Sequence, residues 1–249
     1  MKAEPAIQCV QANWPAPANV RALSTTRLGG YSTGRYAGLN LAMHVGDDAD
    51  TVARNRESLS STLKLPSSPM WLNQVHGERL IDAAEWQDGL SADACYTGKP
   101  DTVCAILTAD CLPLLLCNEA GTRVAAIHLG WRGICSSLIP QAINRMDSAP
   151  SGILAWIGPH IHAESYEVGA DVLAAASGVS ATAMDAFTPT REDRWLLSMS
   201  ALVAGVLKEH GLAKIYMAES CVYRDSQRFY SYRREHHTGR MASLIWMET

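Results

Sequence analysis

The most apolar long stretch of the chain runs from Thr102 to Gly121, and it constrains the fold more than any other segment. Asp110, Pro113 and Glu119 interrupt it, which makes it a poor candidate for a membrane-spanning helix. Its composition instead predicts two buried strands separated by a turn. A chain of 249 residues can bury a substantial core around such strands without disulfides or metals.

Further apolar runs and helical patterns follow one another in mixed order. Residues 49–63 form a helical pattern that begins after Asp47-Asp48, a candidate N-cap. Pro140 lies inside the helical pattern at 134–146, where it either kinks that helix or starts a new one at its first turn. The other expected strands are 21–26, 70–75, 103–108, 112–117, 124–129, 153–157, 214–218, 228–232 and 241–247, and the other helices are 134–146, 168–176 and 199–210. This order predicts an α+β fold, a single-domain mixed β-sheet sandwich flanked by helices, and no linker divides residues 1–249.

Charge and cysteine usage exclude several classes of protein. The net charge of −4, from 25 acids and 21 bases, gives no broad basic field, so neither nucleic acid nor a membrane surface is expected as a partner. Residues 1–5 lack the apolar core of a signal peptide, which predicts the cytoplasm. Seven cysteines without a CxxC pair argue against a disulfide framework in that compartment.

Three short segments each place a metal-ligating residue type at the end of an apolar strand, beside glycine or proline. They contain His76, Cys111 and His128. Two imidazoles and a thiolate suit zinc, and three protein ligands leave a fourth position for water or substrate. The three residues are far apart in the sequence, so they could equally be two packed histidines and a buried thiol.

The same segments resemble the laccase-domain, or YfiH-like, family, whose members were once described as polyphenol oxidases and are now regarded as purine nucleoside phosphorylases. The resemblance covers nearly the whole chain. Its motifs are Thr25-Thr26-Arg27-Leu28-Gly29-Gly30, Leu39-Asn40-Leu41, His44-Val45-Gly46-Asp47-Asp48, Asn55-Arg56, Ala92-Asp93-Ala94, Ile157-Gly158-Pro159, Tyr166-Glu167-Val168-Gly169, Phe229-Tyr230-Ser231-Tyr232-Arg233-Arg234 and Thr238-Gly239-Arg240.

This resemblance implies that His76, Cys111 and His128 ligate zinc, with copper also proposed for the family. It also implies phosphorolysis of adenosine, inosine and methylthioadenosine, with adenosine deamination as a second activity. The implied partners are therefore a purine nucleoside and phosphate, and the chain could be a monomer or a homodimer.

Phosphorolysis needs groups that bind an anion. Arg27, which opens a glycine-rich loop, is the first candidate for a catalytic phosphate-binding residue, followed by Arg56 and Arg132. Each could instead form a structural ion pair. His44 is a further candidate for the pocket, and Arg233-Arg234 could bind phosphate, although we expect one of the two to pair with a nearby acid.

Deamination needs a carboxylate that moves protons beside a metal-bound hydroxide. Asp93 and Asp110 are the candidates, and Asp110 adjoins a ligand, so a structural role is favoured for it. Three other functions use the same residues. They are a copper-dependent polyphenol oxidase, a cysteine hydrolase that acts in cell-wall precursor editing with Cys111 as nucleophile and His128 as base, and a binding protein with a structural metal.

Overall fold

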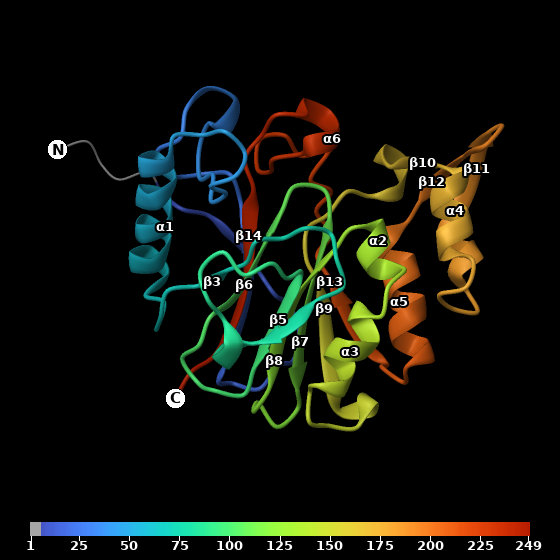
Figure 1. The fold of residues 1–249 in the computed structure, drawn as a ribbon, viewed down its shortest axis with the longest axis horizontal. Helices are drawn as coiled ribbons and strands as arrows, with labels where there is room; N and C mark the ends of the chain where they lie inside the picture. Colours follow the sequence, from blue (N-terminus) through green and yellow to red (C-terminus); the bar gives the residue numbers. More distant parts are fainter. Residues whose placement is uncertain (1–5) are drawn as a thin grey trace.

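The computed structural model describes residues 6–249, so residues 1–5, on which the expectation of a missing export signal rests, lie outside the described part. Two large sheets face each other (Figure 1). The first has the strand order β1 (Cys9–Gln11), β2 (Val20–Thr25), β14 (Met241–Met247), β6 (Cys104–Thr108), β3 (Met70–Trp71). The second has the order β13 (Lys214–Met217), β9 (Ile153–Ile157), β7 (Leu112–Asn118), β8 (Val124–Leu129), β5 (Ala94–Thr97), β4 (Leu80–Asp82).

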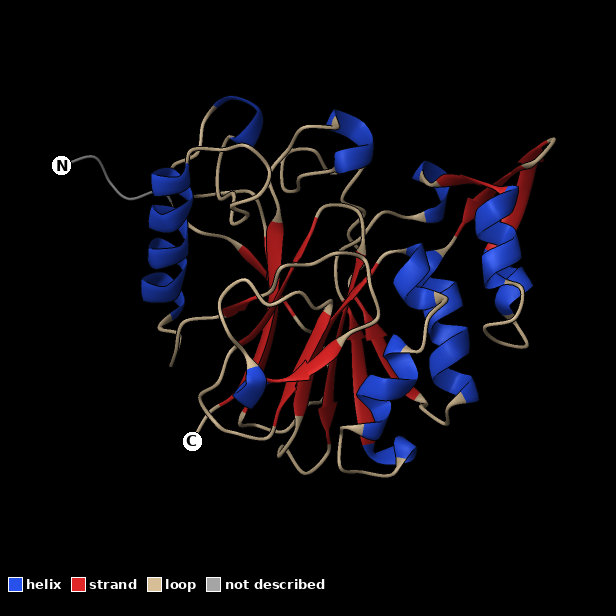
Figure 2. Cartoon of the chain, in the orientation of Figure 1, coloured by secondary structure: helices blue, strands red, loops and turns tan. Residues whose placement is uncertain are grey.

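Helices cover the outer faces of both sheets, which gives four layers (Figure 2). Helix α1 (Ala49–Leu63) lies against the first sheet. The second sheet is covered by α2 (Trp131–Ile134), α3 (Leu138–Asn144), α4 (Ala170–Ala176) and α5 (Met199–Glu209). A small sheet of β10 (Glu167–Gly169), β12 (Arg194–Leu197) and β11 (Phe187–Arg191) lies beside α4, and α6 (Tyr232–Glu235) precedes β14. Short 3₁₀ helices span Gly34–Tyr36, Ala83–Glu85, Pro150–Gly152, Ala163–Ser165 and Ala183–Ala186.

The core between the two sheets joins side chains from both. Ile106 and Ile245 from the first sheet and Leu115 and Trp156 from the second are at most 1% exposed. Burying apolar side chains of this size contributes about 1.5–3 kcal/mol each. This packing fixes the distance between the sheets, and with it the strand ends that carry the candidate site.

The predicted α+β architecture with mixed sheets and flanking helices is confirmed. The helix over 49–63 begins after Asp48, whose carboxylate accepts the Thr51 N–H at 2.8 Å. Pro140 lies in the first turn of α3, the second of the two expected arrangements. The pattern at 134–146 is therefore two helices with a break, since α2 ends at Ile134. The single domain expected over residues 1–249 stays a prediction.

The two strands predicted within Thr102–Gly121 are present, but they belong to different sheets. Strand β6 pairs in the first sheet and β7 in the second. The turn between them therefore carries the chain from one layer to the other, and Cys111 lies in this turn. This crossing sets the position of the candidate site.

Two predicted elements have other bounds in the structure, and several short strands were not predicted. The strand expected at 70–75 ends at Trp71, because the Gln74 side-chain amide, and not a strand, pairs with both backbone groups of Leu107 at 2.7 and 2.8 Å. The helix expected at 168–176 begins two residues later, since Val168 lies in β10. The smaller sheet and strands β4 and β5 had no expected counterpart, because short strands with few apolar residues give little pattern.

The strand predicted at 228–232 is wrong. The Phe229 N–H donates to the Asp225 carbonyl at 3.0 Å in a turn, and the Tyr230 N–H contacts the Met241 sulfur at 3.2 Å. The Phe229 carbonyl accepts from the Arg234 guanidinium at 2.8 Å. These backbone groups are satisfied by side chains and a turn, so the buried aromatic residues pack without belonging to a sheet.

Among the described residues, no helix is both long and apolar enough to cross a bilayer.

Candidate metal centre and its cavity

His76, Cys111 and His128 converge. One ligand atom from each lies within 4.8 Å of the other two, and the His76 Nε2 to Cys111 Sγ distance is 3.8 Å. The two imidazole rings meet edge to face, with centroids 4.7 Å apart. His76 follows β3, Cys111 lies between β6 and β7, and His128 is near the end of β8. The structure therefore brings together the three residues that the sequence singled out.

Strand pairing explains why residues so distant in the chain meet. His128 pairs with Pro113 across β7 and β8, and its N–H donates to the Asp93 carbonyl at 2.8 Å. Gly130 follows β8 directly beside the cluster. A Cβ atom on Gly130 would lie 3.1 Å from His76 Cδ2 and 3.4 Å from Cys111 Sγ. Glycine at this position thus leaves the space that a bound ion needs.

Asp93 supports two of the three residues from behind. Its fully buried carboxylate accepts the backbone N–H groups of Val75, His76 and Gly77 at 3.2, 3.0 and 2.7 Å, and contacts His128 Nδ1 at 2.8 Å. These bonds hold His76 in the left-handed backbone region, with φ of 57°, which a histidine rarely adopts. Because Nδ1 of His128 faces Asp93, Nε2 is the nitrogen that remains for a ligand.

The charges of the cluster depend on one another. Burial alone would raise the pKa of the Cys111 thiol, but the charges and hydrogen bonds of His128 and His76 lower it to about 6. Burial would likewise lower the pKa of His128, but the Cys111 thiolate and Asp93 raise it to about 9. The cluster therefore favours a thiolate, the form of cysteine that ligates metals.

Asp110 joins this cluster to the other side of the cavity. It has a φ of 94°, and its carboxylate accepts the Ser231 hydroxyl at 2.5 Å and the Arg233 N–H at 2.6 Å. Burial raises the pKa of Asp110, and the hydrogen bonds from Ser231 and Arg233 partly offset this effect. These bonds stabilise an unusual backbone conformation directly before Cys111.

A cavity of about 720 Å³ opens over the cluster. Three guanidinium groups line it, those of Arg132, Arg233 and Arg240, which we call the arginine wall. They lie 4.2, 5.0 and 5.8 Å from the ring centroids of Trp131, Tyr166 and Tyr232 respectively, and these rings line the same cavity. The cavity therefore combines the His/Cys/His group, positive charge and aromatic surface.

The candidate phosphate-binding residues separate into two groups. Arg132 and His44 line the cavity with Asp110, and burial together with Arg240 and Arg56 lowers the pKa of His44. Arg27 and Arg56 do not line it. Instead, the Arg56 guanidinium lies 4.3 Å from the Trp71 ring centroid and donates to the Leu41 carbonyl at 2.9 Å, and burial lowers its pKa to about 10.

Arg27 lies outside this cavity and contacts α6 through Glu235. Its guanidinium stacks on Tyr230, 4.5 Å from the ring centroid, and pairs with Glu235 at 3.5 Å. It lines a second cavity of about 440 Å³ with Arg35, Glu235 and His237. Arg27 is thus separate from the His/Cys/His group. Its ion pair with Glu235 corresponds to the structural role that the sequence left open for it.

Some cavity residues had no place among the candidates. Arg240, Tyr166 and Gln74 line the cavity, and no role was assigned to them, although Tyr166 and Arg240 belong to motifs of the family resemblance and Gln74 precedes His76 by two residues. Arg233 and Arg234 divide as expected, because Arg234 pairs with Glu235 at 3.1 Å while Arg233 lines the cavity. Its place in the motif Thr238-Gly239-Arg240 is the signal that could have selected Arg240, but that motif does not say which of its residues faces the cavity.

The donor set fits a metal ion. Two imidazoles and a thiolate on strand ends, a carboxylate bonded to the far nitrogen of one imidazole, and a glycine beside them match the arrangement of a three-ligand site with an open position. The His/Cys/His group can therefore bind a metal.

Comparisons with known proteins agree with this arrangement. A family model described as "Multi-copper polyphenol oxidoreductase laccase" matches residues 21–248. Two proteins named "Purine nucleoside phosphorylase YfiH", from Shigella flexneri and Escherichia coli (strain K12), are each 44% identical over 235 residues, 94% of this chain and 96% of theirs. The crystal structure of Neisseria meningitidis protein NMB0706 superimposes with a TM-score of 0.93 at 42% identity, covering 97% of this chain and 99% of that one. This chain therefore belongs to the laccase-domain, YfiH-like family.

Proposed function

We propose that this chain is a zinc-dependent purine nucleoside phosphorylase of the cytoplasm that acts on adenosine, inosine and methylthioadenosine. The proposal rests on one observation, the presence of the His76–Cys111–His128 group and the arginine wall in a single cavity. Relatives that bear the name purine nucleoside phosphorylase support the same activity. Copper is the alternative ion for these donors.

The arginine wall is the proposed phosphate site. Arg240 is half-buried and held by its own hydrogen bonds to the carbonyls of Thr238 and Gly239 at 2.8 and 3.0 Å. Arg233 lies on α6, and its guanidinium donates to the Glu167 carbonyl at 3.2 Å. Guanidinium groups bind phosphate through paired, charge-assisted hydrogen bonds, so this wall would orient the attacking anion.

The remaining groups would bind the nucleoside and move protons. When bound, zinc would supply a Lewis-acid position with one open coordination site. The aromatic rings of Trp131, Tyr166 and Tyr232 offer the purine stacking surfaces. Asp110 is the only acid among the described residues that line the cavity, so we assign it the proton transfer of a second, adenosine deaminase activity. Asp93 lies behind the cluster and would fix the orientation of His128.

The test is base release by metal-loaded protein. Hypoxanthine should appear from inosine only when phosphate is present, with an equal amount of ribose 1-phosphate. Replacing Arg233 with Gln removes a charge-assisted contact worth about 1.5–3 kcal/mol, which predicts a rise of about ten- to a hundredfold in the KM for phosphate. Arg21→Gln is the matched control, since Arg21 pairs with Glu248 on the exposed surface. Equal base release without phosphate would identify a hydrolase and end the proposal.

One observation favours a second candidate, a cysteine hydrolase. Asp93, His128 and Cys111 form a chain of contacts in the order carboxylate, imidazole, thiol, which is the order of a nucleophilic triad. In this case metal would inhibit, because a ligated thiolate is a poor nucleophile. Hydrolysis of an amide or ester that rises on chelation, and stops on alkylation of Cys111, would favour this activity over phosphorolysis.

A further inference from the structure

Helix α6 carries one side of the cavity, although it is only four residues long. Tyr232, Arg233 and the following His236 line the cavity. A helix of this length has few internal hydrogen bonds, so its own backbone cannot fix its position. The placement of Arg233 must therefore come from other contacts.

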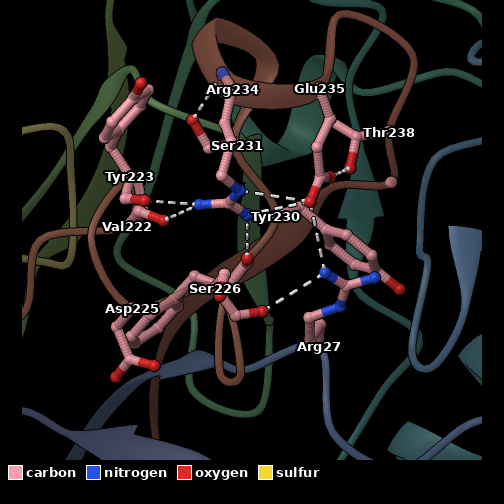
Figure 3. Close-up of polar contacts among 12 residues, drawn as sticks. Arg27, Val222, Tyr223, Asp225, Ser226, Tyr230, Ser231, Arg234, Glu235 and Thr238 are labelled. Carbon is pink, nitrogen blue, oxygen red and sulfur yellow. Dashed lines mark hydrogen bonds and ion pairs between the residues drawn. The ribbon is translucent and has the colours of Figure 1, made fainter. Parts of the chain in front are cut away.

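Arg234, the next residue, does not line the cavity, and its side chain points toward the carbonyls of the preceding loop (Figure 3). One guanidinium nitrogen donates to the carbonyls of Val222 and Tyr223 at 2.8 and 2.7 Å, and the other donates to the Phe229 carbonyl at 2.8 Å. The planar guanidinium thus binds three backbone carbonyls that no strand satisfies. This contact ties α6 to both ends of the loop 222–229.

Glu235 provides the second attachment of the helix. Its carboxylate accepts the Arg234 guanidinium at 3.1 Å and the Thr238 hydroxyl at 2.6 Å, and pairs with Arg27 at 3.5 Å (Figure 3). Arg27 also donates to the Ser226 carbonyl at 3.3 Å. Arg27 and Arg234 both contact the loop and Glu235, but Arg234 belongs to α6 itself and binds three loop carbonyls, where Arg27 binds one. Loss of the Arg234 guanidinium therefore removes the direct bonds from α6 to these carbonyls and one contact of Glu235.

We propose that Arg234 is a positioning residue that sets the phosphate affinity of Arg233 without touching the ligand. The inference rests on the proposed phosphorylase function. Without the Arg234 guanidinium, the three carbonyls lose their donor, and α6 is held only by its contacts with Asp110 and by those of Glu235 with Arg27 and Thr238, so it can move more. Phosphate binding would then have to order Arg233, and this conformational cost would weaken the binding of phosphate more than that of the nucleoside.

The experiment compares Arg234→Gln and Arg234→Lys with Arg228→Gln in metal-loaded enzyme. Arg228 lies in the same loop and pairs with Asp225, and among the described residues its side chain forms no hydrogen bond or ion pair with α6, so it is a matched loss of charge. We expect the KM for phosphate to rise about tenfold in Arg234→Gln, with the KM for inosine nearly unchanged. Lysine should not rescue it, because one ammonium cannot reproduce the planar fork. Metal content should equal that of the wild type in all variants.

The outcomes separate this inference from the function on which it rests. Wild-type turnover that does not depend on phosphate removes the proposed function itself. Phosphate-dependent wild-type turnover, with an unchanged phosphate KM in Arg234→Gln or an equal rise in Arg228→Gln, overturns the positioning role alone. A purely structural role would lower kcat through the fraction of folded enzyme and leave both KM values unchanged. If Arg234→Gln does not fold, Arg234→Lys supplies the same comparison of KM values.

Discussion

The two sides of the cavity are held in place by different means. On the side of the His/Cys/His group, Cys111 and His128 lie at strand ends whose pairing is continuous with the sheet, and buried Asp93 bonds the backbone before and after His76. On the side of α6, the described residues belong to no strand from Ala218 to Arg240, and their carbonyls are bonded by side chains such as Arg234. The side with the His/Cys/His group is thus part of the paired sheets, whereas the side with α6 is attached to them by side-chain hydrogen bonds.

This difference indicates where rigidity matters for the proposed chemistry. A metal site needs its ligands fixed to within a fraction of an ångström, and paired strands over a packed core provide that. Anion recognition by arginine tolerates more movement, so a loop held by hydrogen bonds is sufficient. Asp110, which precedes Cys111 and accepts hydrogen bonds from Ser231 and Arg233, is the direct connection between the two sides.

Removing a metal ligand from the sheet side should reduce activity more than any other change considered. We expect Cys111→Ala to lose bound metal and to lower turnover about 10³-fold or more, since a metal contributes several kcal/mol to such reactions. The protein should stay folded, because Cys111 is half-buried in a turn. Metal analysis and inosine turnover are the measurements. Cys135→Ala is the matched control, because this half-buried cysteine lies at the end of α2, outside the cluster. Full metal occupancy in Cys111→Ala would contradict the assignment.

A smaller effect is expected when the support of the ligands is changed and the ligands are kept. Asp93→Asn should weaken zinc binding about 10- to 100-fold, as is typical for groups that orient a ligating histidine. An amide has one acceptor oxygen, so it cannot accept from His128 and from the N–H groups of Val75 and Gly77 together. Competition with a chelator measures the affinity. An unchanged zinc affinity in folded Asp93→Asn would show that the cluster does not depend on this carboxylate.

The sequence predicted the sheet side of the site better than the side of α6, for a physical reason. His76, Cys111 and His128 stand out because strand ends beside glycine and proline leave a recognisable pattern. Their convergence depends on sheet register, which spacing does not reveal, so the family resemblance was needed to select them. The strand predicted at 228–232 failed because apolar residues there are buried in a loop whose backbone is bonded by Arg234, a contact with no periodic signal.

The arginine residues expected to bind phosphate were also predicted with unequal success. Arg27, Arg56 and Arg132 were the expected phosphate ligands, yet only Arg132 lines the cavity with the cluster. The glycine-rich loop after Arg27 suggested an anion site, whereas the folded chain uses that guanidinium to hold Tyr230 and Glu235. A guanidinium gives the same sequence signal whether it faces a ligand or a carbonyl, so its role depends on packing.

Weakening the hydrogen bond between Ser231 and Asp110, which connects the two sides, should change phosphate binding less than the other substitutions do. Ser231→Ala removes the hydroxyl that donates to Asp110 at 2.5 Å and accepts the Arg234 N–H at 3.3 Å. Loss of this buried hydrogen bond should lower the free energy of unfolding by about 1–2 kcal/mol, and the KM for phosphate should rise about two- to threefold. Ser243→Ala is the matched control, because Ser243 is equally buried but pairs with Ser24 within the first sheet. It should cost similar stability and leave the phosphate KM unchanged. If both variants changed the phosphate KM alike, general stability would explain the effect, and Asp110 would not connect the ligand turn to α6.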